Sequence, residues 1–224
     1  MIQCALNGPR VAMTAHQLAR DARAAVDAGA ASLHLHPYGA DGRESVDPED
    51  VAAAVAEVRA ACPRAELGVP TGARIAADLP AVAAWRDPLP DMASVNLSEE
   101  HHVAVMEALL ARGIAVEAGV WSVDDAERLA SCGLADRCRR VLVEVGGDEQ
   151  LRKAEAVEAA LAGVALPQLH HGEDAGTWDV VRRALGKGLD ARVGLEDTEV
   201  LPGGGRAAGN AALVAAAVDL ARAG

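Results

Sequence analysis

The feature that most constrains the fold is an alternation that recurs along the whole chain: a short apolar run, a turn, and an alanine-rich amphipathic stretch of about 10–15 residues. Eight runs have the length of a strand, namely Ile2 to Leu6, Ala31 to His36, Ala65 to Val69, Met92 to Asn96, Ile114 to Val120, Arg140 to Val145, Ala165 to His170 and Arg192 to Glu196. Eight stretches with helical character lie near 14–28, 48–61, 75–85, 99–112, 123–132, 149–162, 176–187 and 207–222. Eight strand-plus-helix units without a long linker predict one α/β domain over residues 1–224, closed on itself as a (β/α)8 TIM barrel.

Several of the predicted helices have residues suited to a helix start. Thr14, Asp47 and Ser98 are candidate N-caps, because their side-chain oxygens can accept from free backbone N–H groups of the first turn. Pro48 follows Asp47 at the first helical position, where a proline costs no hydrogen bond. These local signals support the helical assignments.

An open doubly wound sheet is the competing architecture, because it also alternates strands and helices. Its nucleotide-binding signatures are missing: no GxGxxG follows the first run, and no GxxxxGK[ST] occurs in the chain. The three glycines at 203–205, which follow Pro202, are interpreted as a flexible turn. The barrel is therefore the preferred prediction.

The composition excludes several classes of function. The chain has 21 Lys plus Arg against 33 Asp plus Glu, and the net charge of −12 argues against a nucleic-acid partner. No apolar run approaches the ~18 residues of a membrane span, and the first twenty residues lack an apolar signal region, so we expect no membrane contact and a cytoplasmic location. The cysteines are scattered without a CxxC pair and are expected to be reduced thiols: Cys4, Cys62, Cys132 and Cys138.

In a barrel the functional groups come from the carboxyl ends of the strands. The second run ends with His34 and His36, and two residues apart on a strand means that both imidazoles point to the same face. Two interpretations are open: half of a metal site, or two barrel histidines satisfied by their neighbours. A zinc site would need a third protein ligand.

The eighth run ends with Glu196 and Asp197. Because the last strand of a closed barrel is separated from the second by the first strand alone, Glu196 could complete a two-His-one-carboxylate set that leaves a coordination position open. The two acids can act on the same side only if the backbone turns here, since neighbours on a regular strand point to opposite faces. A solvated acidic loop is the alternative.

Several segments together resemble one enzyme family. They are Asn7-Gly8-Pro9-Arg10, Ala28-Gly29-Ala30 leading into His34-Leu35-His36, Met92-Ala93-Ser94-Val95-Asn96, Arg192-Val193-Gly194-Leu195-Glu196-Asp197, and Gly209-Asn210-Ala211. In this order, and spanning almost the whole chain, they are similar to the β-keto acid cleavage enzymes. The best-known activity of that family is the cleavage of 3-keto-5-aminohexanoate, and the chain resembles a short-form member.

The resemblance implies a zinc-dependent barrel enzyme that condenses a β-keto acid with acetyl-CoA and cleaves a carbon–carbon bond, giving acetoacetate and a new acyl-CoA. By position, His34, His36 and Glu196 resemble the zinc ligands, Asp197 the base, and Arg192 the arginine beside it. The predicted substrate-binding residues are Asn7, Arg10, Thr71, Gly72, Ser94, Asn96, Glu117 and His170, the last in a His170-His171 pair that ends the seventh run and could meet substrate or the CoA phosphates. The resemblance also implies a homo-oligomer, a tetramer or a dimer.

The chain departs from the family pattern at three positions. Arg10 stands where better-known members carry a glutamate, Pro70 replaces the serine of a Ser-Thr-Gly-Gly segment, and Gly119 replaces the second acid of a Pro-Glu-x-Glu motif of which Glu117 is kept. An arginine at the rim would favour an acidic group over an amino group on the substrate. The chain is also shorter than typical members, chiefly after the fourth strand and at its end.

Two other functions are compatible with the same residues. The first is a metal-dependent aldolase or hydrolase that needs no CoA, and the second is a paralogue that binds a ligand without turnover, which the three departures would explain. Cleaving a bond next to a carbonyl requires stabilising negative charge on the carbonyl oxygen, and a divalent cation does so directly. Both enzymatic hypotheses therefore place the chemistry at the His34, His36 and Glu196 cluster.

Overall fold

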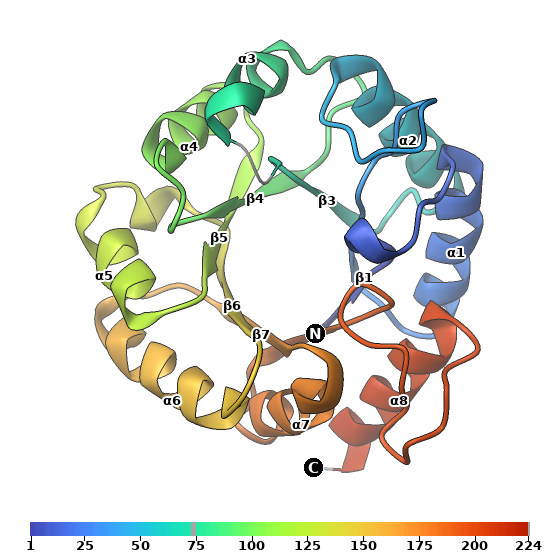
Figure 1. Cartoon of the computed structure of the whole chain (residues 1–224), viewed down its shortest axis with the longest axis vertical. Helices are drawn as coiled ribbons and strands as arrows, with labels where there is room; N and C mark the ends of the chain where they lie inside the picture. Colours follow the sequence, from blue (N-terminus) through green and yellow to red (C-terminus); the bar gives the residue numbers. More distant parts are fainter. Residues whose placement is uncertain (73–74, 224) are drawn as a thin grey trace.

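The computed structural model describes residues 1–72 and 75–223, and it contains a closed barrel of eight strands (Figure 1). The strands are β1 (Ile2–Ala5), β2 (Ser32–His34), β3 (Glu66–Pro70), β4 (Met92–Asn96), β5 (Ala115–Val120), β6 (Arg140–Val145), β7 (Gln168–Gly172) and β8 (Asp190–Val193). Each strand pairs in parallel with the next, and β8 pairs in parallel with β1. The predicted (β/α)8 TIM barrel is confirmed, and the open sheet is excluded by the β1–β8 ladder.

The helices surround the barrel as an outer ring (Figure 1). They are α1 (Ala15–Asp27), α2 (Pro48–Ala61), α3 (Ile75–Ala84), α4 (His102–Ala111), α5 (Val123–Ser131), α6 (Gln150–Ala160), α7 (Thr177–Gly186) and α8 (Asn210–Ala223). None of the described helices is long and apolar enough to cross a membrane.

The predicted helix starts are met in part. Thr14 caps α1 in a capping box with Gln17, and Pro48 is the first residue of α2. Asp47 precedes α2 but makes no capping hydrogen bond with its side chain. The prediction for Ser98 is wrong, because α4 begins only at His102.

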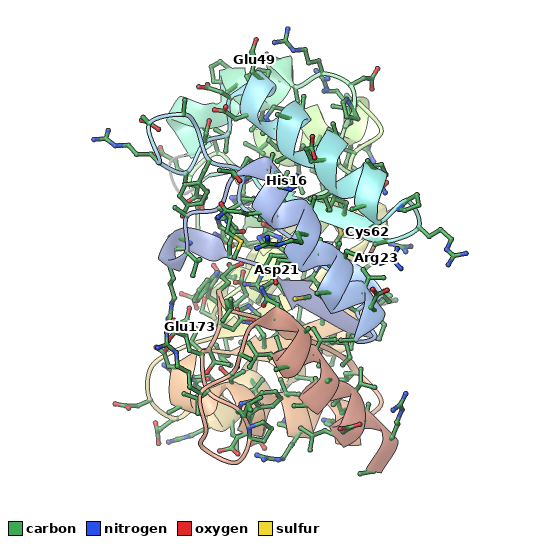
Figure 2. The ribbon with its side chains drawn as sticks, turned by 90° about the vertical axis from the view of Figure 1, so that its right-hand side faces the viewer. His16, Asp21, Arg23, Glu49, Cys62 and Glu173 are labelled. Atoms are coloured by element: carbon green, nitrogen blue, oxygen red, sulfur yellow. The ribbon has the colours of Figure 1, made fainter. Side chains whose placement is uncertain are left out.

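Small side chains let the helices approach one another and the sheet closely. Helix α1 packs against α2 on one side and α8 on the other (Figure 2). Its buried residues are Leu18, Ala19, Ala22 and Ala25, three of which are alanines. In a chain without phenylalanine, the core between helices and sheet is thus filled by many short side chains at close spacing. All four cysteines are free thiols.

Strands β2 and β8 end earlier than predicted, and the residues of interest lie just beyond them. Strand β2 ends at His34, so His36 follows the strand, and β8 ends at Val193, so Glu196 and Asp197 lie in a turn. The N–H groups of Asp197 and Thr198 donate to the carbonyl oxygen of Gly194 at 2.9 Å each. This is the backbone turn on which a shared role of the two acids depends.

Gly194 begins this turn because the backbone of β1 leaves no room for a side chain. A Cβ at residue 194 would lie 1.9 Å from the carbonyl oxygen of Ala5. The close approach brings the turn after β8 against the end of β1 and thereby toward β2.

A buried ion-pair network fills the barrel interior near the amino ends of the strands. Arg140 Nε contacts Glu117 Oε1 at 2.6 Å, and its Nη1 contacts Glu66 Oε2 at 2.9 Å. Gln3 Nε2 also donates to Glu117 Oε1 at 3.2 Å. The expectation that Glu117 binds substrate is therefore corrected: its Oε1 is held by Arg140 and Gln3, and the residue does not line the cavity described next.

Candidate functional site

A cavity of about 380 Å³ opens at the carboxyl ends of the strands. Its lining is polar and contains most of the predicted site residues: Pro9, Arg10, His34, His36, Glu44, Pro70, Thr71, Gly72, Ser94, Asn96, Trp121, Leu142, Glu144, His171, Glu173, Arg192, Glu196 and Asp197. Glu173, labelled in Figure 2, marks the side of the molecule on which this cavity lies. The position is the one at which barrel enzymes build their active sites.

Three side chains from two distant segments converge in this cavity. His34 Nε2 lies 3.1 Å from His36 Nε2, and Glu196 places Oε1 3.4 Å from His36 Nε2 and Oε2 3.9 Å from His34 Nε2. Among the described residues these three form a group whose donor atoms all lie within 4.8 Å of one another.

The spacing of these atoms fits a shared metal ion. Zinc binds nitrogen and oxygen at about 2.0–2.2 Å in tetrahedral geometry, which puts its ligand atoms about 3.3 Å apart. Glu196 Oε2 is buried and has no hydrogen-bond partner in the described part of the chain, as expected of an atom whose partner is an ion. Two imidazoles and one carboxylate would also leave a coordination position open for a substrate.

Two further residues hold His36 in place. Its Nδ1 lies 2.7 Å from Glu44 Oε1, which keeps a proton on Nδ1 and leaves the Nε2 lone pair for a metal. The side-chain amide of Asn7 donates from Nδ2 to the His36 carbonyl and accepts at Oδ1 from the His36 N–H, both at 2.9 Å. Asn7, predicted to bind substrate, does not line the cavity and instead positions His36, a candidate metal ligand.

The carboxylates of Glu196 and Glu44 give the donor set a negative field that favours a cation, either a proton on His36 or a metal ion that displaces this proton. Burial lowers the pKa of His34 well below its ordinary value, so its imidazole is neutral. Burial would also lower the pKa of His36, but the carboxylates of Glu196 and Glu44 raise it to about 9. Although burial opposes ionisation of Glu196, Arg192 and the two imidazoles hold the pKa of that carboxyl well below its ordinary range.

Arg192 joins the two acids of the turn after β8. Its Nη2 lies 2.6 Å from Glu196 Oε1 and 2.9 Å from Asp197 Oδ1, while Nε donates to Asp197 Oδ2 at 3.4 Å. Arg192 is 2% exposed, and burial strengthens such ion pairs relative to those at the surface. One arginine thus fixes the orientation of both carboxylates.

Two neighbouring segments shape the pocket around Glu196. Gly8 has a φ of +54° and leaves no space for a side chain, since a Cβ would lie 2.3 Å from Glu196 Cγ. At the start of α8, Asn210 accepts from the Leu195 N–H at 2.8 Å and donates to the Leu6 carbonyl at 2.6 Å. The first and last segments of the chain together therefore place the carboxylate.

The two histidines at the end of β7, His170 and His171, point to opposite faces of the strand. His171 lines the cavity, with Nδ1 at 3.2 Å from Asp197 Oδ1 and Nε2 at 3.0 Å from Glu144 Oε2. His170 does not line the cavity, and Glu158 of α6 and Arg183 of α7 lie close enough to influence its charge. The substrate-binding prediction for His170 is therefore corrected to its neighbour, because adjacent strand residues face opposite ways.

Glu144 was missed by the sequence reasoning. It lies inside an otherwise apolar strand, Arg140–Val145, and a buried carboxylate in such a run is itself a signal of a functional position. Its place in β6, two strands from β8, gave no reason to join it to the other acids. The register of β6 against β7 places it beside His171.

The loop after β3 and the strand β4 itself supply the predicted hydroxyl and amide groups. Thr71 Oγ1 donates to the Ser94 carbonyl at 2.9 Å, and Gly72 adopts a φ of +96° that favours glycine. Thr71, Gly72, Ser94 and Asn96 all line the cavity.

Arg10 lies at the rim and is already paired. Its Nη1 contacts Asp174 Oδ1 at 2.6 Å and its Nη2 donates to Asp174 Oδ2 at 3.3 Å. Because Asp174 compensates the guanidinium charge, an acidic group on a substrate would have to compete with this carboxylate.

The fold and the site define a (β/α)8 barrel with a polar cavity that holds a two-histidine, one-carboxylate donor set at its mouth. The sequence matches the beta-keto acid cleavage enzyme family over residues 1–131 and 171–224. The chain belongs to the beta-keto acid cleavage enzyme family.

Solved structures extend this comparison. The chain is similar to ObcA in a binary complex with oxaloacetate, at 19% identity and a TM-score of 0.73, with 92% of this chain and 62% of that chain covered. A ternary complex of ObcA with a C4-CoA adduct and oxalate gives the same identity and TM-score, with 93% and 63% covered. This chain thus spans less than two thirds of the length of ObcA.

A more distant likeness concerns the fold alone. The type I 3-dehydroquinate dehydratase of Clostridium difficile is 12% identical, with a TM-score of 0.68 and coverage of 99% and 90% of the two chains. Comparison with curated protein sequences found no match.

Proposed function

We propose that the chain is a cytoplasmic, zinc-dependent β-keto acid cleavage enzyme. In the proposed reaction, the acetyl group of acetyl-CoA is joined to the carboxymethyl part of the β-keto acid as acetoacetate. The remaining acyl group of the keto acid becomes a thioester of the released CoA. One carbon–carbon bond forms, one breaks, and no oxidant or reductant is needed.

The observation that carries the proposal is the convergence of His34, His36 and Glu196 beside the Arg192–Asp197 pair, in a member of this family. The complexes of ObcA with oxaloacetate and with a C4-CoA adduct support a keto acid and a CoA thioester as the substrate classes. A zinc ion bound to the three donors would supply Lewis-acid stabilisation of the negative charge that develops on the keto oxygen.

The residues of this chain then have separate tasks. Asp197 takes the proton from the carbon between the keto and carboxylate groups of the substrate, and Arg192 holds its carboxylate in place through two nitrogens. Thr71, Ser94 and Asn96 line the opposite wall and bind the polar groups of the substrate. 3-Keto-5-aminohexanoate is one of the β-keto acids to be tested as a substrate.

The test is turnover of a panel of β-keto acids, with and without acetyl-CoA, followed by the appearance of acetoacetate. We expect acetoacetate only when both substrates and zinc are present. Products formed equally well without acetyl-CoA would instead indicate an aldolase or hydrolase. Binding of zinc and acyl-CoA without any product would indicate a paralogue that only binds its ligand.

We further propose that the chain forms a homo-oligomer, a dimer or a tetramer. Alanine-rich outer helices bury little surface each, so additional burial between copies would stabilise them. Light scattering of the purified protein measures its mass against the 22.9 kDa of one chain, and a monomer at micromolar concentration would contradict the proposal.

A further inference from the structure

The proposed reaction leaves one buried polar group of the cavity unused, the carboxylate of Glu144. Glu144 is 7% exposed, and its Oε2 accepts from His171 Nε2 at 3.0 Å. Its other oxygen, Oε1, accepts no hydrogen bond from the described residues, and Glu144 lines the cavity. A carboxylate oxygen that faces a cavity without a protein donor is available to accept a hydrogen bond from a ligand.

A second acceptor, Asn96 Oδ1, lies next to Gly119 on the same side as Glu144 Oε1. A Cβ at residue 119 would lie 2.4 Å from Asn96 Oδ1 and 3.1 Å from Glu144 Oε1. The two oxygens therefore converge on the same small space, which exists because Gly119 has no side chain. A hydrogen-bond donor of a ligand placed in this space lies within reach of both oxygens.

The orientation of the Asn96 amide follows from its partners. The indole Nε1–H of Trp121 donates to Asn96 Oδ1 at 3.2 Å, and Asn96 Nδ2 donates to Glu99 Oε1 at 3.1 Å. An indole N–H is only a donor and a carboxylate is only an acceptor, so the atom facing Glu144 is the amide oxygen. Its second lone pair is available to a ligand.

The charge of Glu144 is already balanced. His171 places Nε2 3.0 Å from Glu144 Oε2 and Nδ1 3.2 Å from Asp197 Oδ1, so the ring lies between two carboxylates. Two flanking carboxylates favour the positively charged form of an imidazole. A neutral donor therefore suits this pair of oxygens better than a second cation.

We infer that Glu144 Oε1 and Asn96 Oδ1 form a subsite that recognises a hydroxyl group on the β-keto acid, remote from its keto and carboxylate groups. The inference rests on the proposed function, which puts the keto acid at the donor set of His34, His36 and Glu196. These donors follow β2 and β8, the two neighbours of β1, whereas Gly119 and Glu144 belong to β5 and β6 across the barrel (Figure 1). His171 acts as the positioning residue of Glu144.

Three acids that differ at one carbon test the subsite: 3-oxohexanoate, 5-hydroxy-3-oxohexanoate and 5-amino-3-oxohexanoate. Binding to the zinc-loaded protein is measured by titration calorimetry without acetyl-CoA, so that the readout does not depend on turnover. We expect the hydroxy acid to bind about 10-fold or more tightly than the unsubstituted acid, as for a buried hydrogen bond to a charged acceptor.

Two variants should remove this preference. Gly119→Ala adds a methyl group where the two oxygens converge and pushes them apart; residue 119 has no positive φ that would strain an alanine. In Glu144→Gln, the side-chain oxygen of the new glutamine accepts the hydrogen bond from His171 Nε2. The amide nitrogen of the glutamine then faces Asn96 and donates to Asn96 Oδ1. Glu127→Gln, an exposed change of the same kind on α5, is the matched control and should keep the preference.

The outcomes are separate for the subsite and for the reaction. Equal binding of the hydroxy and unsubstituted acids, a preference that survives in folded Gly119→Ala and Glu144→Gln proteins, or no binding of any of the three acids overturns the subsite. If 5-amino-3-oxohexanoate binds as tightly as 5-hydroxy-3-oxohexanoate, the inference that the subsite prefers a neutral donor over a cation is overturned. A hydroxyl preference in binding without acetyl-CoA-dependent turnover keeps the subsite and contradicts only the proposed reaction.

Discussion

The side-chain amide of Asn7 makes two hydrogen bonds to the backbone of His36, donating to its carbonyl oxygen and accepting from its N–H at 2.9 Å each. A single side chain at the end of β1 thus fixes the residue that follows the end of β2. This contact, and not contact with a substrate, explains why an asparagine is needed at position 7.

Asn7→Asp should weaken metal binding. The aspartate keeps the acceptor for the His36 N–H but places a second oxygen against the His36 carbonyl, so one hydrogen bond becomes a repulsion. We expect zinc affinity to fall about 10-fold or more, as for other residues that orient a metal ligand. Chelator competition measures the affinity, and an unchanged value in a protein that melts like the wild type would contradict this role.

Removal of one candidate ligand should remove metal and activity together. His34→Ala leaves only His36 and Glu196, and we expect less than one tenth of the wild-type zinc content, with loss of acetoacetate formation. Elemental analysis after dialysis and the turnover assay measure the two effects. His16→Ala, on the outer face of α1 (Figure 2), is the control and should retain both. Full activity of metal-free His34→Ala would refute the metal site.

Arg192→Met should destabilise the fold as well as stop turnover. It leaves the carboxylates of Glu196 and Asp197 facing each other without the guanidinium, and unpairing a buried charge costs about 3–5 kcal/mol. Urea unfolding of the metal-free protein measures the loss. Because a bound cation would compensate part of the negative charge, zinc should restore some of the stability, and the absence of any loss would show that the ion pair is dispensable.

The charge on His171 should give a pH-dependent contribution to stability. Burial and Arg192 lower its pKa, but Asp197 and Glu144 outweigh them and raise it from 6.5 to about 9. The folded protein therefore holds this proton where the unfolded chain has released it. The stabilisation is complete below about pH 6.5 and is lost as the pH rises through about 9.

The difference in unfolding free energy between wild type and His171→Gln should accordingly shrink as the pH rises from 6.5 to 9. Urea unfolding at several pH values measures it, and the ring proton shifts of His171 in NMR spectra report the titration directly. A midpoint near 6.5 would mean that the two carboxylates do not hold the proton.

Glu117→Gln should affect stability and not substrate binding. The carboxylate pairs with Arg140 and accepts from Gln3 below the cavity, so its neutralisation leaves a buried guanidinium with Glu66 as its remaining carboxylate partner. We expect a loss of about 3 kcal/mol in unfolding free energy with KM unchanged for any β-keto acid that is turned over. A raised KM in a protein of unchanged stability would show that Glu117 contributes to substrate binding after all.

The sequence by itself determined the barrel. Eight apolar runs alternate with eight amphipathic stretches, and this periodicity follows from short-range physics: each strand must be covered by the helix that comes after it. It also singled out His34, His36 and Glu196 as a group, because strand ends meet at one face in any such barrel. Local signals of this kind need no knowledge of distant contacts.

The tertiary structure decided which polar groups face the same space. Whether His170 or His171 enters the cavity depends on the register of β7, and a shift of one residue exchanges the two faces. The expected role of Glu117 was wrong and Glu144 was missed for a similar reason: their partners, Arg140 and His171, lie on neighbouring strands but 23 and 27 residues away in sequence. Contacts over such separations are set by the register of neighbouring strands and by side-chain packing, which no local pattern of residues encodes.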